Sequence, residues 1–287
     1  MRPILQQLVD LLSLERIEKN LFRGDSQDLG WGAVFGGQVV GQALSAAAQT
    51  VPADRMIHSL HGYFLRSGDA KKPIVYDVDR IRDGKSFTTR RVVAIQNGEA
   101  IFSLSCSFQQ IEDGFAHQSE MPDVPAPEDI VPDHEINRRY ADQLPPFLRL
   151  QITAERPIEA RVVNPPENPF APPIEKPTRY VWYRAVDALP DDPLLHQYLL
   201  AYASDFHFLG TALQPHGKSW FNPGMQVTSL DHAIWFHRPF RMDEWLLHVM
   251  ESPSASGARG LVRGQFFNRA GHLVASTAQE GLIRKRE

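Results

Sequence analysis

The segment GGQVVGQALSAAAQTV, residues 36–51, combines small and apolar side chains and contains no charged residue. It predicts a helix that is buried on every side, because no face of it is polar enough to prefer water. A second long helix is expected at DDPLLHQYLLAYASDFHFLG, residues 191–210. Asp191 or Asp192 suits its N-cap, Pro193 its first helical position and Gly210 its C-terminal end.

The sequence that flanks these two predicted helices is repeated. Each helix is followed by a similar phrase, HSLHGYFLRSGD at 58–69 and SLDHAIWFHRPF at 229–240. Strand-like runs follow at 83–110 and 256–284, with turns at residues 97–98 and 270–271, and Asn-Gly between apolar runs is a strong hairpin signal. Eight residues after the turn glycines stand Cys106 and Gln279. Short strand-like segments at 15–24 and 156–164 open the two halves, which therefore look like diverged copies of one unit.

A proline-rich stretch separates the copies. Residues 121–177 hold 13 of the 22 prolines. Proline fixes its own dihedral angle and lacks a backbone donor, so we expect a crossing linker with short regular pieces, of which the apolar 147–152 packs. The predicted domains are 1–115, a linker at 116–177 and 178–287, the last with a first strand that starts near residue 156.

Composition limits the classes of partner. The chain has 287 residues, enough for two domains that each bury a core, and a formal net charge of -4 without a dense basic run. Nucleic acid is therefore not an expected partner. A single cysteine, no signal-peptide pattern and no apolar run of membrane-spanning length predict a cytoplasmic protein without a membrane partner.

The phrase at 229–240 contains Ser, His and Asp, which suggests a nucleophilic triad, and two histidines, which suggest a metal. In one continuous strand, side chains alternate between faces, so Ser229 and His232 would point apart, as would His232 and His237. That geometry argues against both the triad and a metal site. We expect a central strand covered on both sides, with Asp231, His232 and His237 as satisfied polar groups. Cys106 stands in a strand pattern without an adjacent base and is expected in the core.

A helix buried lengthwise against a curved antiparallel sheet is a hot dog, and two copies make a double hot dog. The segments FGGQVVGQAL, HSLHGYFLRSGD, ASDFHFLGTALQPHG, SLDHAIWFHRPF and EWLLHVMESPSASGARGLVRGQFFNRAGHLVASTAQEG resemble the acyl-CoA thioesterase II family over nearly the whole chain. The resemblance implies an α+β tandem double hot dog that hydrolyses medium- to long-chain acyl-CoA. It also implies a homodimer or homotetramer. We expect no cofactor and no metal.

The resemblance implies three site residues: Asp205 in ASDFHFL, Ser229 in TSLDH and Gln279 in STAQEG. Asp205 would take a proton from water, while Ser229 and Gln279 orient that water. The adjacent Thr228 leaves a one-place ambiguity for the hydroxyl. From the residues alone, Asp205 shares an apolar helix face with Tyr198, Tyr202 and Leu209, and an ordinary surface aspartate beside His207 and Lys218 remains the alternative. The first helix has Gln38 and Gln42 where the second has this acid.

Aromatic residues near the predicted site suggest an acyl tunnel, although core roles are equally open: Phe206, Phe208, Trp220, Phe221 and Trp235. Arg238, Arg259 and Arg263 could meet CoA phosphates, although ordinary surface charges are the favoured interpretation. Two other functions remain open, an acyl-thioester hydratase or dehydratase and a non-catalytic acyl-CoA-binding protein.

Overall fold

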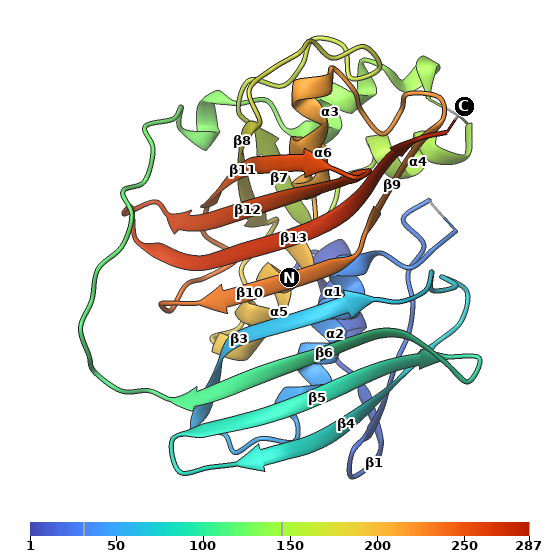
Figure 1. Cartoon of the computed structure of the whole chain (residues 1–287). Helices are drawn as coiled ribbons and strands as arrows, with labels where there is room; N and C mark the ends of the chain where they lie inside the picture. Colours follow the sequence, from blue (N-terminus) through green and yellow to red (C-terminus); the bar gives the residue numbers. More distant parts are fainter. Residues whose placement is uncertain (31, 145, 287) are drawn as a thin grey trace.

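One antiparallel sheet curves around two central helices (Figure 1). The computed structural model describes residues 1–30, 32–144 and 146–286. In the first half the strands are β1 (Glu15–Glu18), β2 (Leu21–Gly24), β3 (Arg55–Phe64), β4 (Ile74–Asp83), β5 (Phe87–Gln96) and β6 (Glu99–Gln110). In the second half they are β7 (Ile158–Val162), β8 (Thr178–Ala185), β9 (Met225–Ser229), β10 (Asp231–Phe236), β11 (Leu246–Ser256), β12 (Arg259–Asn268) and β13 (Leu273–Lys285).

The strand order is symmetric about the centre of the sheet. It runs β1-β2-β4-β5-β6-β3-β10-β13-β12-β11-β8-β7, and β9 also pairs with β13. The halves meet where β3 pairs with β10, with Ser59 opposite Trp235 and Tyr63 opposite Asp231. Each strand on one side thus has a counterpart at the same place on the other, which confirms the predicted α+β tandem double hot dog.

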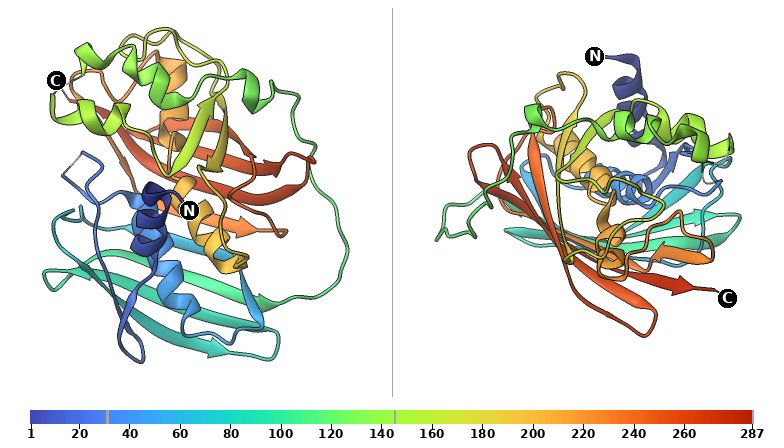
Figure 2. Two further views of the ribbon diagram at one scale, coloured as in Figure 1. Left: turned by 180° about the vertical axis from the view of Figure 1, so that it is seen from behind. Right: turned by 90° about the horizontal axis from the view of Figure 1, so that it is seen from above.

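Helix α2 (Gly36–Ala48) confirms the predicted buried helix and ends three residues before the predicted boundary. It packs against α5 (Pro193–Ala203), and α1 (Pro3–Leu12) packs on α2 from the same side of the sheet (Figure 2). Small residues allow the close approach: a Cβ on Gly41 would lie 3.2 Å from the carbonyl oxygen of Tyr198, and one on Gly37 would clash with the carbonyl oxygen of Tyr202. The lack of charge in 36–51 therefore reflects helix-on-helix burial.

The second helix is shorter than predicted. Asp192 caps it as expected, accepting a hydrogen bond from Leu194 N at 3.0 Å, but α5 ends at Ala203. A turn follows, with His207 in the left-handed region at φ 62°, and then α6 (Phe208–Leu213). The single helix 191–210 and its stop at Gly210 were wrong, because side-chain bonds from Tyr183 to the carbonyl of Phe206 and to the ring of His207 hold the turn. Asp205 therefore lies in a turn rather than on a helix.

The predicted strand at 229–237 is interrupted at Leu230. Its N–H donates to the Glu280 carbonyl and its own carbonyl accepts from Phe64 N, at 2.9 Å each. The pairing with β13 shifts by one residue between β9 and β10. Ser229 and His232 both contact the side chain of Gln279, so the expectation that they point apart was wrong. The expectation of a strand covered on both sides was also wrong, because Trp235 is 44% exposed.

Of the other polar groups and the cysteine that were expected to be buried, some are buried and one is exposed. His232 is fully buried and hydrogen-bonded, as expected, whereas His237 is exposed and bonds to Ser276 Oγ at 2.9 Å. Cys106 is a core residue, as expected, and burial raises the pKa of its thiol to about 12. No helix in the described part of the chain is long and apolar enough to cross a membrane.

After β6 the chain runs without regular structure past the ends of the strands to the second half (Figure 1). It then forms short helices, among them α3 (Asp133–Arg138) and α4 (Pro146–Thr153). Ile152 and Leu144 form a small buried cluster against Phe170 and Phe221. The prediction that residues 147–152 pack concerns mainly the side chains of residues 147, 148, 150 and 151, which lie outside the described residues.

Candidate active site

Asp205 lies in the turn between α5 and α6, where it faces the N-terminus of α2. Its Oδ2 accepts a hydrogen bond from Gly37 N at 2.9 Å, and its Oδ1 accepts one from Gln279 Nε2 at 3.0 Å. The N-terminal end of a helix carries unpaired N–H groups and a partial positive charge, which favour a carboxylate. The alternative left open by the sequence, that Asp205 is an ordinary surface aspartate, does not fit these two hydrogen bonds.

Gln279 links the other two predicted site residues, Asp205 and Ser229. It is 1% exposed on β13, and its Nε2 donates to Ser229 Oγ at 2.5 Å as well as to Asp205. Between the two neighbouring hydroxyls, Ser229 is the one in this hydrogen bond, whereas Thr228 is exposed. The structure thus brings Asp205, Ser229 and Gln279 together around one amide.

His232 is the residue near this group that sequence reasoning did not place there. Its Nδ1 lies 3.1 Å from Gln279 Oε1 and its Nε2 lies 2.8 Å from Ser204 Oγ. Burial lowers the pKa of His232, so the ring is neutral near pH 7. The only sequence feature that could have placed His232 near the site was its position in the phrase SLDH. The assumption of one continuous strand predicted the wrong face for its side chain.

A cavity of about 780 Å³ opens beside Asp205 and Ser229. This volume falls within the usual range for small-molecule sites. Both halves contribute to its wall, with Gly36 at the start of α2 from the first half and residues of β9 and α6 from the second. Linker residues complete the wall, so the proline-rich stretch is part of the cavity.

The cavity separates the predicted aromatic residues into two groups. Phe206, Trp220 and Phe221 line it, whereas Phe208 is fully buried in the core and Trp235 lies exposed on the sheet. The first three remain candidates for contact with an apolar ligand.

The arginines suggested for phosphate binding lie elsewhere. Arg259 pairs with Glu280 at 2.9 Å, Arg263 pairs with Glu251 at 2.7 Å and Arg238 donates to the Leu273 carbonyl at 2.8 Å. The cations that line the cavity are Arg156, Arg161, Arg179 and Lys218. Among the residues that the structure describes at the cavity wall, Arg161 lies in β7 and Arg179 in β8, whereas none of the three suggested arginines is present.

A hydrogen bond ties the linker to the turn that carries Asp205. His207 Nε2 lies 2.9 Å from Asp133 Oδ2, and His207 Nδ1 lies 2.8 Å from the hydroxyl of Tyr183. Burial acts to raise the pKa of Asp133, but the nearby His207 and two arginines outweigh it and the pKa is lowered. Asp133 is therefore an anion that fixes α3 against the cavity.

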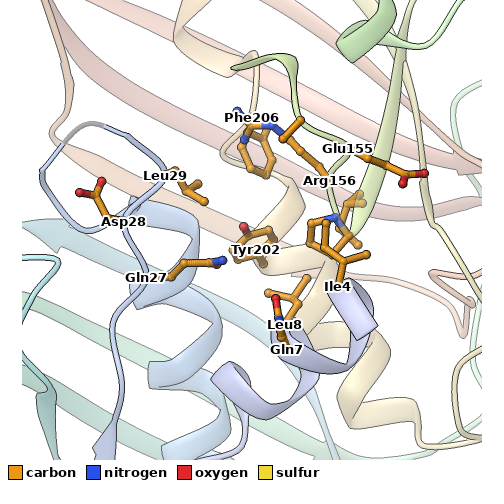
Figure 3. Close-up of a pocket in the computed structure, with 13 residues that line it drawn as sticks. Ile4, Gln7, Leu8, Gln27, Asp28, Leu29, Glu155, Arg156, Tyr202 and Phe206 are labelled. Carbon is orange, nitrogen blue, oxygen red and sulfur yellow. The ribbon is translucent and has the colours of Figure 1, made fainter. Parts of the chain in front are cut away.

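A smaller cavity of about 190 Å³ lies between α1 and the turn after α5 (Figure 3). Phe206 and Arg156 line both cavities, and the guanidinium of Arg156 lies 5.2 Å from the centre of the Phe206 ring. In Figure 3, Tyr202 and Leu8 border the same space from α5 and α1. Phe206 thus stands between the two cavities, next to Asp205 in the chain.

Comparison with known proteins covers both halves. A family model described as acyl-CoA thioesterase matches residues 149–282, and one described as acyl-CoA thioesterase N-terminal domain matches residues 26–109. The chain is 49% identical to "Acyl-CoA thioesterase 2" of Haemophilus influenzae over 286 residues, which cover 99% of each chain.

Solved structures agree. The crystal structure of an acyl-CoA thioesterase II, TesB2, from Mycobacterium marinum matches with a TM-score of 0.80 and 44% identity, covering 98% of this chain and 99% of that one. A hot-dog protein of unknown function from Alicyclobacillus acidocaldarius matches with a TM-score of 0.76 at 18% identity over 98% of this chain and 99% of that one, which supports the fold alone. Family models on both halves and near-complete coverage at high identity lead to one conclusion: the chain belongs to the acyl-CoA thioesterase family.

Proposed function

We propose that this protein hydrolyses medium- to long-chain acyl-CoA thioesters to a free fatty acid and CoA, with a water activated by Asp205. The observation that carries the proposal is the convergence of Asp205 and Ser229 on the Gln279 amide at the wall of a cavity of ligand size. Family membership supports the reaction class, and the geometry supports the residue roles.

The hydrogen bonds suggest how the water is held. Both N–H groups of Gln279 are used, one on Asp205 and one on Ser229, so the proton of the Ser229 hydroxyl remains for a group in the cavity. We assign that proton to one lone pair of the water, while Asp205 accepts a proton from the same water. The other lone pair then faces the thioester carbonyl carbon. Gln279 orients the water through its two partners.

The reaction needs no further reagent. The water oxygen bonds to the carbonyl carbon, the proton passes to Asp205, and the carbon–sulfur bond breaks to release the CoA thiolate. The proton on Asp205 returns to solvent or to the thiolate, which restores the carboxylate. General-base catalysis of this kind contributes about 10²- to 10⁴-fold.

The cavity wall suggests how acyl-CoA is recognised. Phe206, Trp220 and Phe221 supply apolar surface for the acyl chain. Arg156, Arg179 and Lys218 supply positive charge for the phosphates of CoA. The medium- to long-chain preference rests on the size of this aromatic-lined space.

The test is release of free thiol from acyl-CoAs with four to eighteen carbons, followed with a thiol reagent. We expect release that is fastest for the medium and long chains. Tight binding without thiol release would indicate a binding protein, and consumption of enoyl-CoA without thiol release would indicate a hydratase; either result would reject the proposal. Fastest release from the shortest chains would reject only the chain-length preference.

Three further features belong to this proposal. We divide the chain into hot dogs at 1–115 and 178–287 joined by 116–177, and we expect a homodimer or homotetramer in the cytoplasm. Exposed Tyr63 and Trp235 on the central strands offer an apolar surface for association. Light scattering on the purified protein measures the assembly.

A further inference from the structure

The side-chain amide of Gln279 has only one orientation that satisfies its neighbours. A carboxylate accepts hydrogen bonds but cannot donate them, so the Nε2 end must face Asp205 Oδ1 at 3.0 Å. The same NH₂ group donates to Ser229 Oγ at 2.5 Å. The carbonyl end, Oε1, must therefore point the other way, where His232 Nδ1 lies at 3.1 Å.

This orientation fixes the proton on His232. Because Oε1 of Gln279 can only accept, Nδ1 of His232 must carry a hydrogen. The ring is neutral, since burial lowers its pKa, so Nε2 is an acceptor. Ser204 Oγ lies 2.8 Å from Nε2 and 2.9 Å from the Ala201 carbonyl, so its one proton is shared between these acceptors.

His232 is shielded from the cavity. It is fully buried and packs edge-on against Phe208, with ring centres 5.9 Å apart. Among the described residues, those that line the cavity include Asp205 and Ser229 but neither His232 nor Gln279. Any effect of His232 on a substrate is therefore indirect, through its contact with Gln279 or through its contact with Ser204, which precedes Asp205.

We propose that His232 is a positioning residue for thioester hydrolysis: its Nδ1–H holds the Gln279 amide so that Nε2 faces Asp205 and Ser229. The inference rests on the proposed function of those three residues. Without the Nδ1 donor, Oε1 is a buried acceptor without a partner, and the amide gains by rotating away from Asp205. The Ser229 hydroxyl then loses the donor that directs its own proton into the cavity.

The test uses two substitutions of similar size. In His232→Asn, the Nδ2 group occupies nearly the place of Nδ1 and can donate to Gln279; in His232→Leu, no donor is present. We expect His232→Leu to lower kcat by about 10- to 100-fold with KM within about 3-fold, and His232→Asn to restore kcat to within about 3-fold of wild type. Thermal unfolding of both variants accounts for losses due to instability.

A purely structural role for His232 would make the Asn and Leu variants equally active, or would make activity follow thermal stability. Either outcome overturns the inference, as does a His232→Leu enzyme with normal kcat. His232→Gln adds a control, because its amide nitrogen lies at the Nε2 position and leaves Oε1 of Gln279 without a donor. We expect it to behave like His232→Leu.

A double-mutant cycle separates this inference from the proposed function. If His232 acts through Gln279, His232→Leu has little further effect on kcat once Gln279→Leu is present. Additive losses would contradict the inference while leaving the role of Gln279 intact. Full activity of Gln279→Leu alone would instead reject the proposed site, and with it the role of His232.

Discussion

The Oδ2 atom of Asp205 accepts a hydrogen bond from the backbone N–H of Gly37 at 2.9 Å, across 168 residues of sequence. Asp205 belongs to the second half of the chain, and Gly37 lies in the first turn of α2 in the first half. The carboxylate is thus held by a helix end from the other half, where the helix dipole favours negative charge. Although the first half lacks the acid, it completes the candidate site.

Replacement of Asp205 by Asn tests the proposed base. Asn is nearly isosteric and keeps an acceptor for one of the two donors, so we expect the fold to persist. Loss of the base should lower kcat by about 10²- to 10⁴-fold in the thiol-release assay. Asp142→Asn is the matched control, because the Asp142 side chain is 100% exposed. Near-normal turnover by Asp205→Asn would remove this residue from the mechanism.

Gly36→Ala tests how closely α2 must approach the carboxylate. A Cβ at position 36 would lie 2.7 Å from Asp205 Oδ2 and 3.0 Å from the Phe64 ring, so the carboxylate must move. Because a displacement of about 1 Å can cost about 100-fold in rate, we expect kcat to fall at least about tenfold with little change in melting temperature. Gly114→Ala is the control, since a Cβ there meets nothing within 4 Å. Unchanged kcat would show that Asp205 tolerates the shift.

Asp133→Ala tests the attachment of the linker to the cavity. Removal of the carboxylate breaks the 2.9 Å contact with His207 and frees α3, which lines the cavity. We expect KM for a long-chain acyl-CoA to rise several-fold while kcat changes less, because Asp133 does not contact the proposed base. Asp129→Ala, at an exposed position of the same linker, should leave KM unchanged. A fall in kcat at constant KM would place Asp133 in the chemical step instead.

Histidine burial makes stability depend on pH. His248 is fully buried, bonds to Thr277 Oγ1 at 3.1 Å, and has its pKa lowered well below the usual value by burial. Below pH about 6.5 the unfolded chain binds a proton at this residue that the folded chain does not, so the free energy of unfolding falls as the pH falls. Between pH 7.5 and 5.5 this one residue should remove about 1.4 kcal/mol.

Denaturant titrations at the two pH values measure this effect. In His248→Gln the decrease should be smaller than in wild type by about 1.4 kcal/mol, although both proteins retain the contribution of His232. His117→Gln, at an exposed position, is the control. An unchanged pH dependence in His248→Gln would contradict the assignment.

Local sequence determined much of the fold. The uncharged 36–51 segment specifies a buried helix, since burying a charge is costly unless the charge is paired. The repeated phrase and the turns at 97–98 and 270–271 specify two similar units, and the structure places their strands symmetrically. The resemblance to a family supplied Asp205, Ser229 and Gln279, which the structure brings into hydrogen-bond contact.

Tertiary contacts determined where α5 ends and which way His232 faces. Strand alternation and helical spacing could not predict either feature. The turn at 204–207 ends α5 early because Tyr183 and Asp133, both distant in sequence, bind the left-handed His207. The break at Leu230 turns His232 toward Gln279, because the pairing with β13 shifts by one residue there and the Asp231 carboxylate accepts the Glu280 N–H at 2.6 Å. Periodicity assumes that an element continues unchanged, and long-range hydrogen bonds interrupted both elements at the points where the candidate site forms.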